Sequence, residues 1–190
     1  LFGNSTSIST NSINCLAITS VTQTGIDIRN NAFSNTVSGG SPADVHTCLF
    51  LPFTASAGMK LTLNNNAYYT GNTAGLHGVA FAGNSAYNIA NLYTVGNFTP
   101  AITTGAANFR NFSSALGNGS NDFASFGSIA AAPFTSPTDL HIPATTVTAL
   151  ESGGTNISVV LDIDGNLRNG SFPDIGADEI TGGVTNDVGV

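Results

Sequence analysis

The segment IRNNAF at residues 28–33 returns 35 positions later as LNNNAY at residues 63–68. The segment CLAI at residues 15–18 likewise returns 33 positions later as CLFL at residues 48–51. Both matches run in the same order along the chain. One unit therefore reads as a Cys-Leu strand, a Thr/Ser/Gly turn, and a strand that leads into Asn-Asn-Ala-aromatic. A repeat of this length is typical of proteins built from stacked coils.

The strand before each Asn pair alternates apolar and polar residues. Because this alternation has a period of two, we expect Ile26 and Ile28 to face inward in the first copy and Leu61 and Leu63 to face inward in the second. The Asn pair is expected to turn the chain, because Asn tolerates the left-handed backbone region and hydrogen-bonds locally. Each copy is therefore predicted to be a strand, a sharp Asn turn and a second strand.

Stacking the two copies at the usual strand spacing of about 4.8 Å has two consequences. It places Cys15 beside Cys48, within disulfide reach if both side chains point inward, although two buried thiols are an equally open interpretation. It also places the repeated Asn residues one above the other, where their amides can form a hydrogen-bonded ladder. The predicted ladder consists of Asn30, Asn31, Asn65 and Asn66. Chance recurrence in an Asn-rich chain is the competing interpretation, and two matches in the same order argue against it.

The composition favours an all-β domain of extracellular type. Asn, Ser, Thr and Gly together make up 86 of the 190 residues, and only 8% of residues are charged. Lys and Arg number 4 against 11 Asp and Glu, which gives a net charge of -7. This balance argues against nucleic acid or an anionic membrane as a partner, since both require clustered basic residues. The sequence has no apolar run long enough for a transmembrane segment, and we expect it to be a processed piece of a longer chain.

The repeat fades between residues 71 and 121, which we interpret as a loop-rich insertion. A short helix is predicted within Ala106–Gly117. The aromatic residues of this region either pack the insertion onto the coils or offer ring faces to a ligand, and packing is the preferred interpretation for most of them. The candidate sugar-binding rings are Tyr68, Tyr69, Tyr87 and Tyr93.

Three motifs near the end of the chain carry a family resemblance. They are PFTSPTDLHI at residues 133–142, DIDGNLR at 162–168 and PDIGADE at 173–179. This block resembles the C-terminal region of exported bacterial, Bacteroidetes-type, right-handed parallel β-helix surface proteins. The resemblance implies an all-β right-handed parallel β-helix, or β-solenoid, as a single domain over residues 1–180, with residues 181–190 as a tail or linker. It also marks His141 as structural.

The acidic block allows two interpretations. A Ca²⁺ ion could bind its carboxylates, but the Asp-x-Asp-Gly spacing lacks further ligands of an EF-hand loop. The preferred interpretation is a polar cap on the last coil, with Arg168 pairing to Asp162, Asp164 or Asp174. The residues of the predicted cap are Asp162, Asp164, Arg168 and Asp174. No other metal and no cofactor are expected.

No catalytic constellation stands out among the scattered carboxylates and histidines. We therefore predict a non-catalytic domain of a secreted or cell-surface protein that serves as an adhesin, a stalk or a scaffold that contacts polysaccharide or cell-surface glycan. End-to-end association with further coils or copies is a second expectation. The alternative function is the C-terminal part of a polysaccharide lyase or glycoside hydrolase of parallel β-helix fold, because that fold hosts such enzymes. An ice-binding solenoid ranks last, since Thr-x-Thr matches are isolated.

Overall fold

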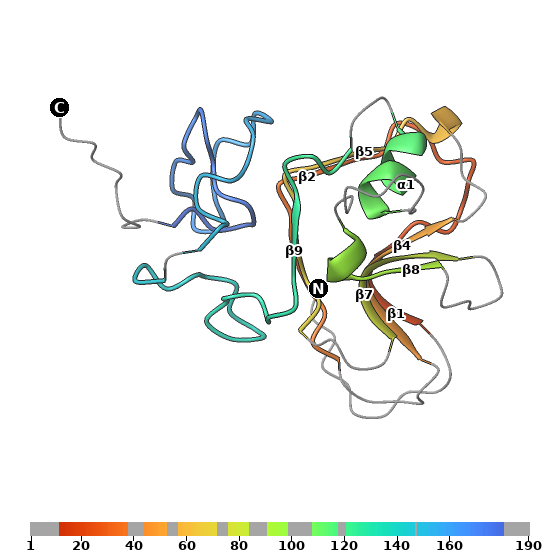
Figure 1. Ribbon diagram of the computed structural model, residues 1–190. Coiled ribbons are helices and arrows are strands. Elements are labelled where there is room, and N and C mark those ends of the chain that lie inside the picture. Colours follow the sequence, from red (N-terminus) through yellow and green to blue (C-terminus); the bar gives the residue numbers. More distant parts are fainter. Residues whose placement is uncertain are drawn as a thin grey trace.

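The computed structural model of the chain describes residues 12–37, 44–52, 57–71, 76–83, 91–98, 108–117, 121–146 and 148–180. Its strands are β1 (Ser12–Ala17), β2 (Asp27–Arg29), β3 (Ala32–Ser34), β4 (Val45–Pro52), β5 (Thr62–Asn64), β6 (Ala67–Tyr69), β7 (Leu76–Gly83), β8 (Leu92–Tyr93) and β9 (Phe126–Ser128). Its helices are the 3-10 turns η1 (Ala57–Met59) and η3 (Val95–Asn97) and the helix α1 (Phe109–Ala115). Figure 1 shows their arrangement.

The strands form three sheets with the orders β1-β4-β7-β8, β2-β5 and β3-β6-β9. The two copies of the repeat pair in parallel and in the predicted register. Ile28 lies opposite Leu63 and Phe33 lies opposite Tyr68. In the first sheet, Leu16 lies opposite Leu49. The predicted side-by-side placement of the copies is therefore confirmed.

The predicted right-handed parallel β-helix is nevertheless wrong. The parallel sheets are small and separate, and within the described residues they form no closed or solenoid sheet. A solenoid requires each coil to add a strand to every sheet. Here α1 intervenes, and no strand of the described residues pairs with the far side of β5. That side is met by the isolated bridge of Leu61 with Gly117 and by the N–H of Asp122, which donates to the carbonyl of Leu63. In addition, β8 turns back antiparallel on β7.

The region around residues 71–121 is more than the predicted loop-rich insertion. β7 extends the first sheet by pairing in parallel with β4 over seven positions. The predicted helix is present as α1, and the side chain of Asn108 caps its start by accepting a hydrogen bond from the backbone N–H of Asn111 at 2.8 Å. Among the described residues, no helix has the length and apolar character needed to cross a membrane.

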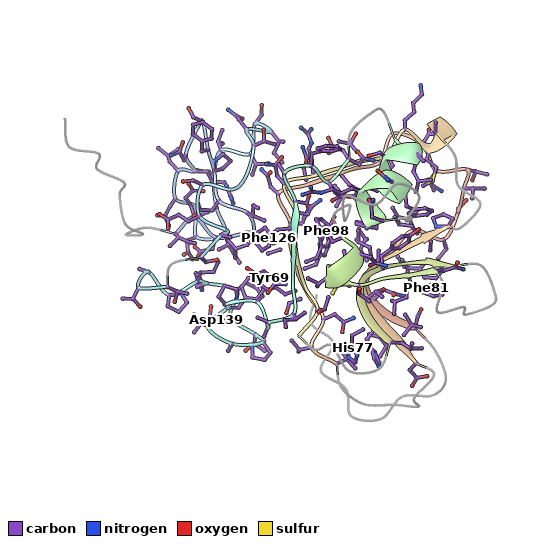
Figure 2. The ribbon with its side chains drawn as sticks, in the orientation of Figure 1. Tyr69, His77, Phe81, Phe98, Phe126 and Asp139 are labelled. Carbon is purple, nitrogen blue, oxygen red and sulfur yellow. The ribbon has the colours of Figure 1, made fainter. Side chains whose placement is uncertain are left out.

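The apolar core lies on both faces of the β3-β6-β9 sheet, because successive side chains of a strand alternate between faces. On one face, Tyr68 stacks on Phe33 and joins a cluster that includes Phe98 and Phe109. On the other face, Tyr69 and Phe126 pack against the C-terminal segment, which we define as residues 129–180. Figure 2 shows Tyr69 and Phe126 on the side of the sheet that faces this segment.

The C-terminal segment contains no strand and no helix in its described residues, and it runs beside β9 on the side away from α1 (Figure 1). Its attachment rests on buried apolar residues that pack against Tyr69, namely Ile142, Leu150, Ile175 and Ile180. The segment is therefore an irregular layer that packs on one face of the sheet. Polar contacts to the Asn turns, described below, also attach it.

Candidate functional site

The Asn turns of the two repeats hold the C-terminal segment. Asn30 and Asn65 adopt the left-handed backbone with φ of 58° and 51°. The side chain of Asn30 donates to the carbonyl of Thr155 at 2.7 Å and accepts from the N–H of Thr155 at 3.0 Å. Asn65 donates to the carbonyl of Gly153 at 2.9 Å. These two amides therefore dock onto the backbone of the C-terminal segment and not onto each other.

The second residue of each Asn turn forms a direct rung. The backbone N–H and the side-chain amide of Asn31 both donate to Oδ1 of Asn66, at 2.9 and 3.3 Å. Asn66 is fully buried, and its own amide donates to the carbonyl of Ile28 at 2.8 Å. The predicted Asn ladder thus consists of one side-chain rung between Asn31 and Asn66, while its other two members hold the neighbouring layer.

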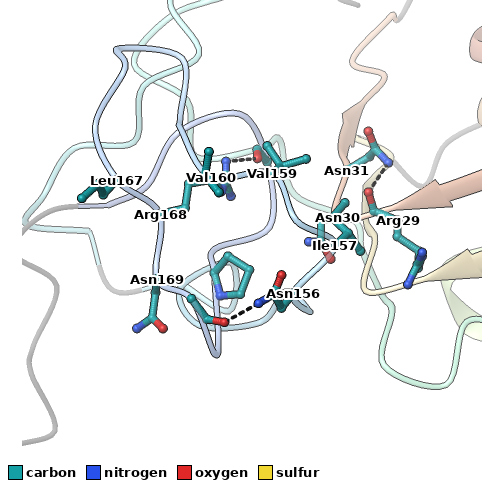
Figure 3. Close-up of a pocket in the computed structure, with 13 residues that line it drawn as sticks. Arg29, Asn30, Asn31, Asn156, Ile157, Val159, Val160, Leu167, Arg168 and Asn169 are labelled. Carbon is teal, nitrogen blue, oxygen red and sulfur yellow. Dashed lines mark hydrogen bonds between the residues drawn. The ribbon is translucent and has the colours of Figure 1, made fainter.

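A pocket of about 330 Å³ lies between the first Asn turn and the loops of the C-terminal segment (Figure 3). We call it the Asn pocket. It is lined by Arg29, Asn30, Asn31, Asn156, Ile157, Val159, Val160, Leu167, Arg168, Asn169, Gly170, Pro173 and Gly176. A second pocket of about 190 Å³ shares Asn30, Asn31 and Gly176 with it. The two pockets therefore adjoin along the first Asn turn.

The Asn pocket is lined by amides, aliphatic side chains and two arginines, of which Arg29 pairs with Asp27 and Arg168 pairs with Glu179. No carboxylate is among its lining residues. Val160 and Leu167 present apolar surface to solvent, with 65% and 80% of each residue exposed. Asn156 fixes one wall by donating to the carbonyl of Gly170 at 2.6 Å (Figure 3). Neutral polar ligands with some apolar surface match such a lining, whereas cationic ligands find no counter-charge in it.

A second cluster of functional side chains lies within the C-terminal segment, and none of its members lines the Asn pocket. Nδ1 of His141 contacts a carboxylate oxygen of Asp139, and its Nε2 lies 3.0 Å from a carboxylate oxygen of Asp164. Asp178 brings a third carboxylate, so that one ligand atom each from His141, Asp164 and Asp178 lies within 4.8 Å of the others. The hydrogen bonds to Asp139 and Asp164 raise the pKa of His141 to about 9.

Sequence reasoning missed this cluster because it treated His141 as structural. The spacing Asp139-x-His141 was the available signal, since a carboxylate two residues away can orient an imidazole. Asp164 and Asp178 lie 23 and 37 positions further along, and only the folding of the segment brings them together.

The predicted acidic cap is divided among separate contacts. Asp162 accepts hydrogen bonds from the N–H groups of Asp164 and Asn166 in its own turn. Asp174 accepts from two other backbone N–H groups of the segment. Arg168 pairs with Glu179, with Nε 3.4 Å from the carboxylate, and not with the acids expected from the sequence. Asp164 belongs to the His141 cluster.

Comparison of the chain with family models, with curated proteins and with solved structures gave no match. The resemblance to exported surface proteins therefore stays a prediction. The functional assignment of this chain rests on its own pockets and clusters.

The predicted sugar-binding tyrosines do not form an exposed surface. Tyr68, Tyr69 and Tyr93 are buried, with 0%, 6% and 8% of each residue exposed, and Tyr87 lies outside the described residues. The hydroxyl of Tyr68 donates to the carboxylate of Asp122 at 2.8 Å inside the core. These three rings serve packing, and the described part of the chain offers ligands the Asn pocket in their place.

The two cysteines are adjacent but not bridged. They occupy facing positions of β1 and β4, and both are free thiols. The thiol of Cys15 donates to the carbonyl of Ser34 at 3.3 Å, and that of Cys48 donates to the carbonyl of Tyr69 at 3.5 Å. Complete burial raises the pKa of the Cys48 thiol. The sequence allowed either a disulfide or two thiols, and the structure shows two thiols.

Proposed function

We propose that this chain is a non-catalytic, carbohydrate-contacting domain of a secreted or cell-surface protein, and that it binds neutral glycans in the Asn pocket. The observation that carries the proposal is the lining of that pocket, which combines amides and exposed aliphatic side chains, contains no carboxylate, and includes two arginines that are already paired with Asp27 and Glu179.

The chemistry of a neutral sugar suits this lining. Its hydroxyl groups both donate and accept hydrogen bonds, as do the side chains of Asn31, Asn156 and Asn169. Its C–H faces are apolar and can cover Val160 and Leu167, which the free protein leaves exposed. The pocket volume of about 330 Å³ falls at the small end of the range for ligand sites. A longer glycan would continue along the first Asn turn into the adjoining pocket.

The composition supports an extracellular setting. With only 8% charged residues, the surface depends on Asn, Ser, Thr and Gly for its hydration. Such a surface repeats the hydroxyl and amide chemistry of glycans themselves. A net charge of -7 disfavours anionic polymers, so that neutral glycans are the preferred class.

The alternative is a polysaccharide-degrading enzyme. Glycoside hydrolysis by the usual mechanisms needs two carboxyl groups about 5 to 10 Å apart across the scissile bond. Neither of the two adjoining pockets has a carboxylate in its lining. No observation in the described residues favours this alternative over binding.

The test is a glycan array of neutral and acidic polysaccharides, followed by calorimetric titration of the best ligand. We expect binding to neutral glycans with no release of reducing ends. Leu167→Asp places a charge in the pocket at an exposed position and should weaken binding at least about tenfold. Ile129→Asp, at an exposed position outside the pocket, is the matched control and should bind like the wild type. Failure to bind any neutral glycan, or equal losses in both variants, would contradict the proposal.

A further inference from the structure

We propose that His141, Asp164 and Asp178 form a binding site for a divalent transition-metal ion of the Zn²⁺ class. The site is separate from the Asn pocket, since none of its three residues lines that pocket. It would fasten two loops of the C-terminal segment to each other.

The three ligand atoms are already gathered. One atom each from His141, Asp164 and Asp178 lies within 4.8 Å of the other two. In a tetrahedral Zn²⁺ site with bonds of about 2.0 to 2.2 Å, two ligand atoms lie about 3.3 to 3.6 Å apart. A pair at the outer limit would therefore need to close by about 1.2 to 1.5 Å, which is within the reach of side-chain rotation in loops.

Asp139 orients the imidazole for this role. Its carboxylate contacts Nδ1 of His141, which leaves Nε2 facing Asp164 at 3.0 Å. Metal-binding histidines commonly donate their other ring N–H to a carboxylate, which fixes the tautomer and makes the ligand nitrogen more basic. Asp139 is itself held by paired backbone hydrogen bonds with Ser136 at 3.1 Å. Asp139 is therefore a positioning residue, and His141 is a ligand.

Asp178 is the most buried of the three proposed ligands. Only 8% of this residue is exposed. Its Oδ2 accepts one hydrogen bond, from the N–H of Ile142 at 2.9 Å, and no Lys or Arg of the described residues forms an ion pair with it. A carboxylate this deeply buried is stable when it is paired or when it coordinates a metal. The metal would provide that partner.

The donor set selects the class of metal. Imidazole nitrogen suits Zn²⁺ and its neighbours, whereas Ca²⁺ and Mg²⁺ prefer sites made of oxygen alone. One nitrogen and two carboxylate oxygens leave a fourth position for water. His141 and Asp164 are half-exposed, so that an ion can reach the site from solvent.

The position of the site indicates its effect. It links the 139–142 loop to the 162–178 loops within a segment that has no strand or helix in its described residues. An ion bound only by the folded state stabilises that state. The competing arrangement is a metal-free contact in which protonated His141 is held between Asp139 and Asp164.

The experiment titrates Co²⁺ into the metal-free 190-residue chain and records the visible absorption spectrum. Co²⁺ at a site with this donor set gives d–d bands that free Co²⁺ lacks at the same intensity, and Zn²⁺ should displace it. We expect one equivalent to bind and the melting temperature to rise with Zn²⁺ but not with Ca²⁺. Absence of bands together with an unchanged melting temperature would overturn the site, as would selective stabilisation by Ca²⁺.

Variants assign the ligands. His141→Ala and Asp178→Asn should abolish the Co²⁺ bands, and Asp139→Asn should weaken binding about 10- to 100-fold without abolishing it. Asp27→Asn removes an acid that pairs with Arg29 on β2 and is the control for loss of charge. Bands that persist in His141→Ala would contradict the assignment, and the wild-type spectrum decides the question even if a variant fails to fold.

Discussion

Asn66 lies opposite Asn31 on the neighbouring copy of the repeat. Its side-chain oxygen Oδ1 accepts hydrogen bonds from both the backbone N–H and the side-chain amide of Asn31. Its own amide reaches back to the carbonyl of Ile28. One buried side chain thus satisfies backbone groups on both sides of the first Asn turn. This turn carries the docking contacts of Asn30 and lines both pockets.

Replacing Asn66 with Leu should lower the free energy of unfolding by about 2 to 6 kcal/mol. The change leaves the N–H of Asn31 and the carbonyl of Ile28 without their partner in a buried place, and each such loss costs about 1 to 3 kcal/mol. Urea denaturation followed by circular dichroism measures the effect. Asn111→Ala, on the exposed face of α1, is the control and should change stability by less than about 0.5 kcal/mol. Equal effects in the two variants would show that the rung contributes nothing.

The buried carboxyl of Asp122 should make the free energy of unfolding depend on pH. Burial raises the pKa of this carboxyl to about 6, although Tyr68 and Ser113 donate hydrogen bonds to it. The stability that follows from a raised pKa is fully present below about pH 4 and is lost as the pH rises through about 6. The loss amounts to about 3 kcal/mol for a shift of this size.

Asp122→Asn should therefore gain stability relative to the wild type as the pH rises from 4 to 7. Asn tolerates the left-handed backbone at this position, where φ is 58°. The measurement is the difference in unfolding free energy between the two proteins at several pH values. Asp27→Asn is the control of opposite sign, because Arg29 lowers the pKa of Asp27, and its difference from the wild type changes below about pH 4 and stays nearly constant from about pH 4 to 7. A difference for Asp122→Asn that stays constant with pH would contradict the prediction.

Arg168 should not tolerate replacement by Lys. Its guanidinium pairs with Glu179 and donates to the carbonyls of Asp174 and Gly176, and its side chain is only 6% exposed. A lysine cannot satisfy these partners together, because it lacks the planar fork of donors. We expect Arg168→Lys to speed hydrogen exchange at the N–H of Gly176, which donates to the carbonyl of Asn30. Unchanged exchange at this amide would show that Arg168 does not hold the segment.

The two thiols should differ in reactivity. Cys15 is half-buried, whereas Cys48 is fully buried and the pKa of its thiol is raised by that burial. Since the thiolate is the reactive form, iodoacetamide should modify Cys15 in the native protein and leave Cys48 unmodified. Peptide mass mapping reads the outcome. A Cys15–Cys48 disulfide in the non-reduced protein, or faster labelling of Cys48, would contradict the prediction.

The strand pairings between the two copies of the repeat could be predicted from the sequence. IRNNAF and LNNNAY share spacing and residue types, so the pairing of β2 with β5 and of β3 with β6 was visible. The pairing of β4 with β7 had a weaker signal that was not used. His46 and Phe50 recur as His77 and Phe81, and the structure places them opposite each other.

Other features depend on contacts that leave no trace in local sequence. β9 pairs with β6 although Phe-Gly-Ser shares no motif with Ala-Tyr-Tyr, because a strand of three residues with one large apolar side chain is too short to carry a pairing signal. The fold class was predicted wrongly because two copies of a repeat were extended to the whole chain, whereas α1 interrupts the stacking. The Asn pocket could not be predicted either, since its walls join residues 29–31 to residues 156–176.

The most direct test of the central claim is an amide chemical-shift map of the ¹⁵N-labelled chain during titration with the neutral glycan that binds best. Binding in the Asn pocket predicts that the largest shifts occur at Asn31, Asn156, Asn169 and Gly170, with saturation at one equivalent. Shifts confined to β1 and β4, or an unchanged spectrum at saturating glycan, would contradict it.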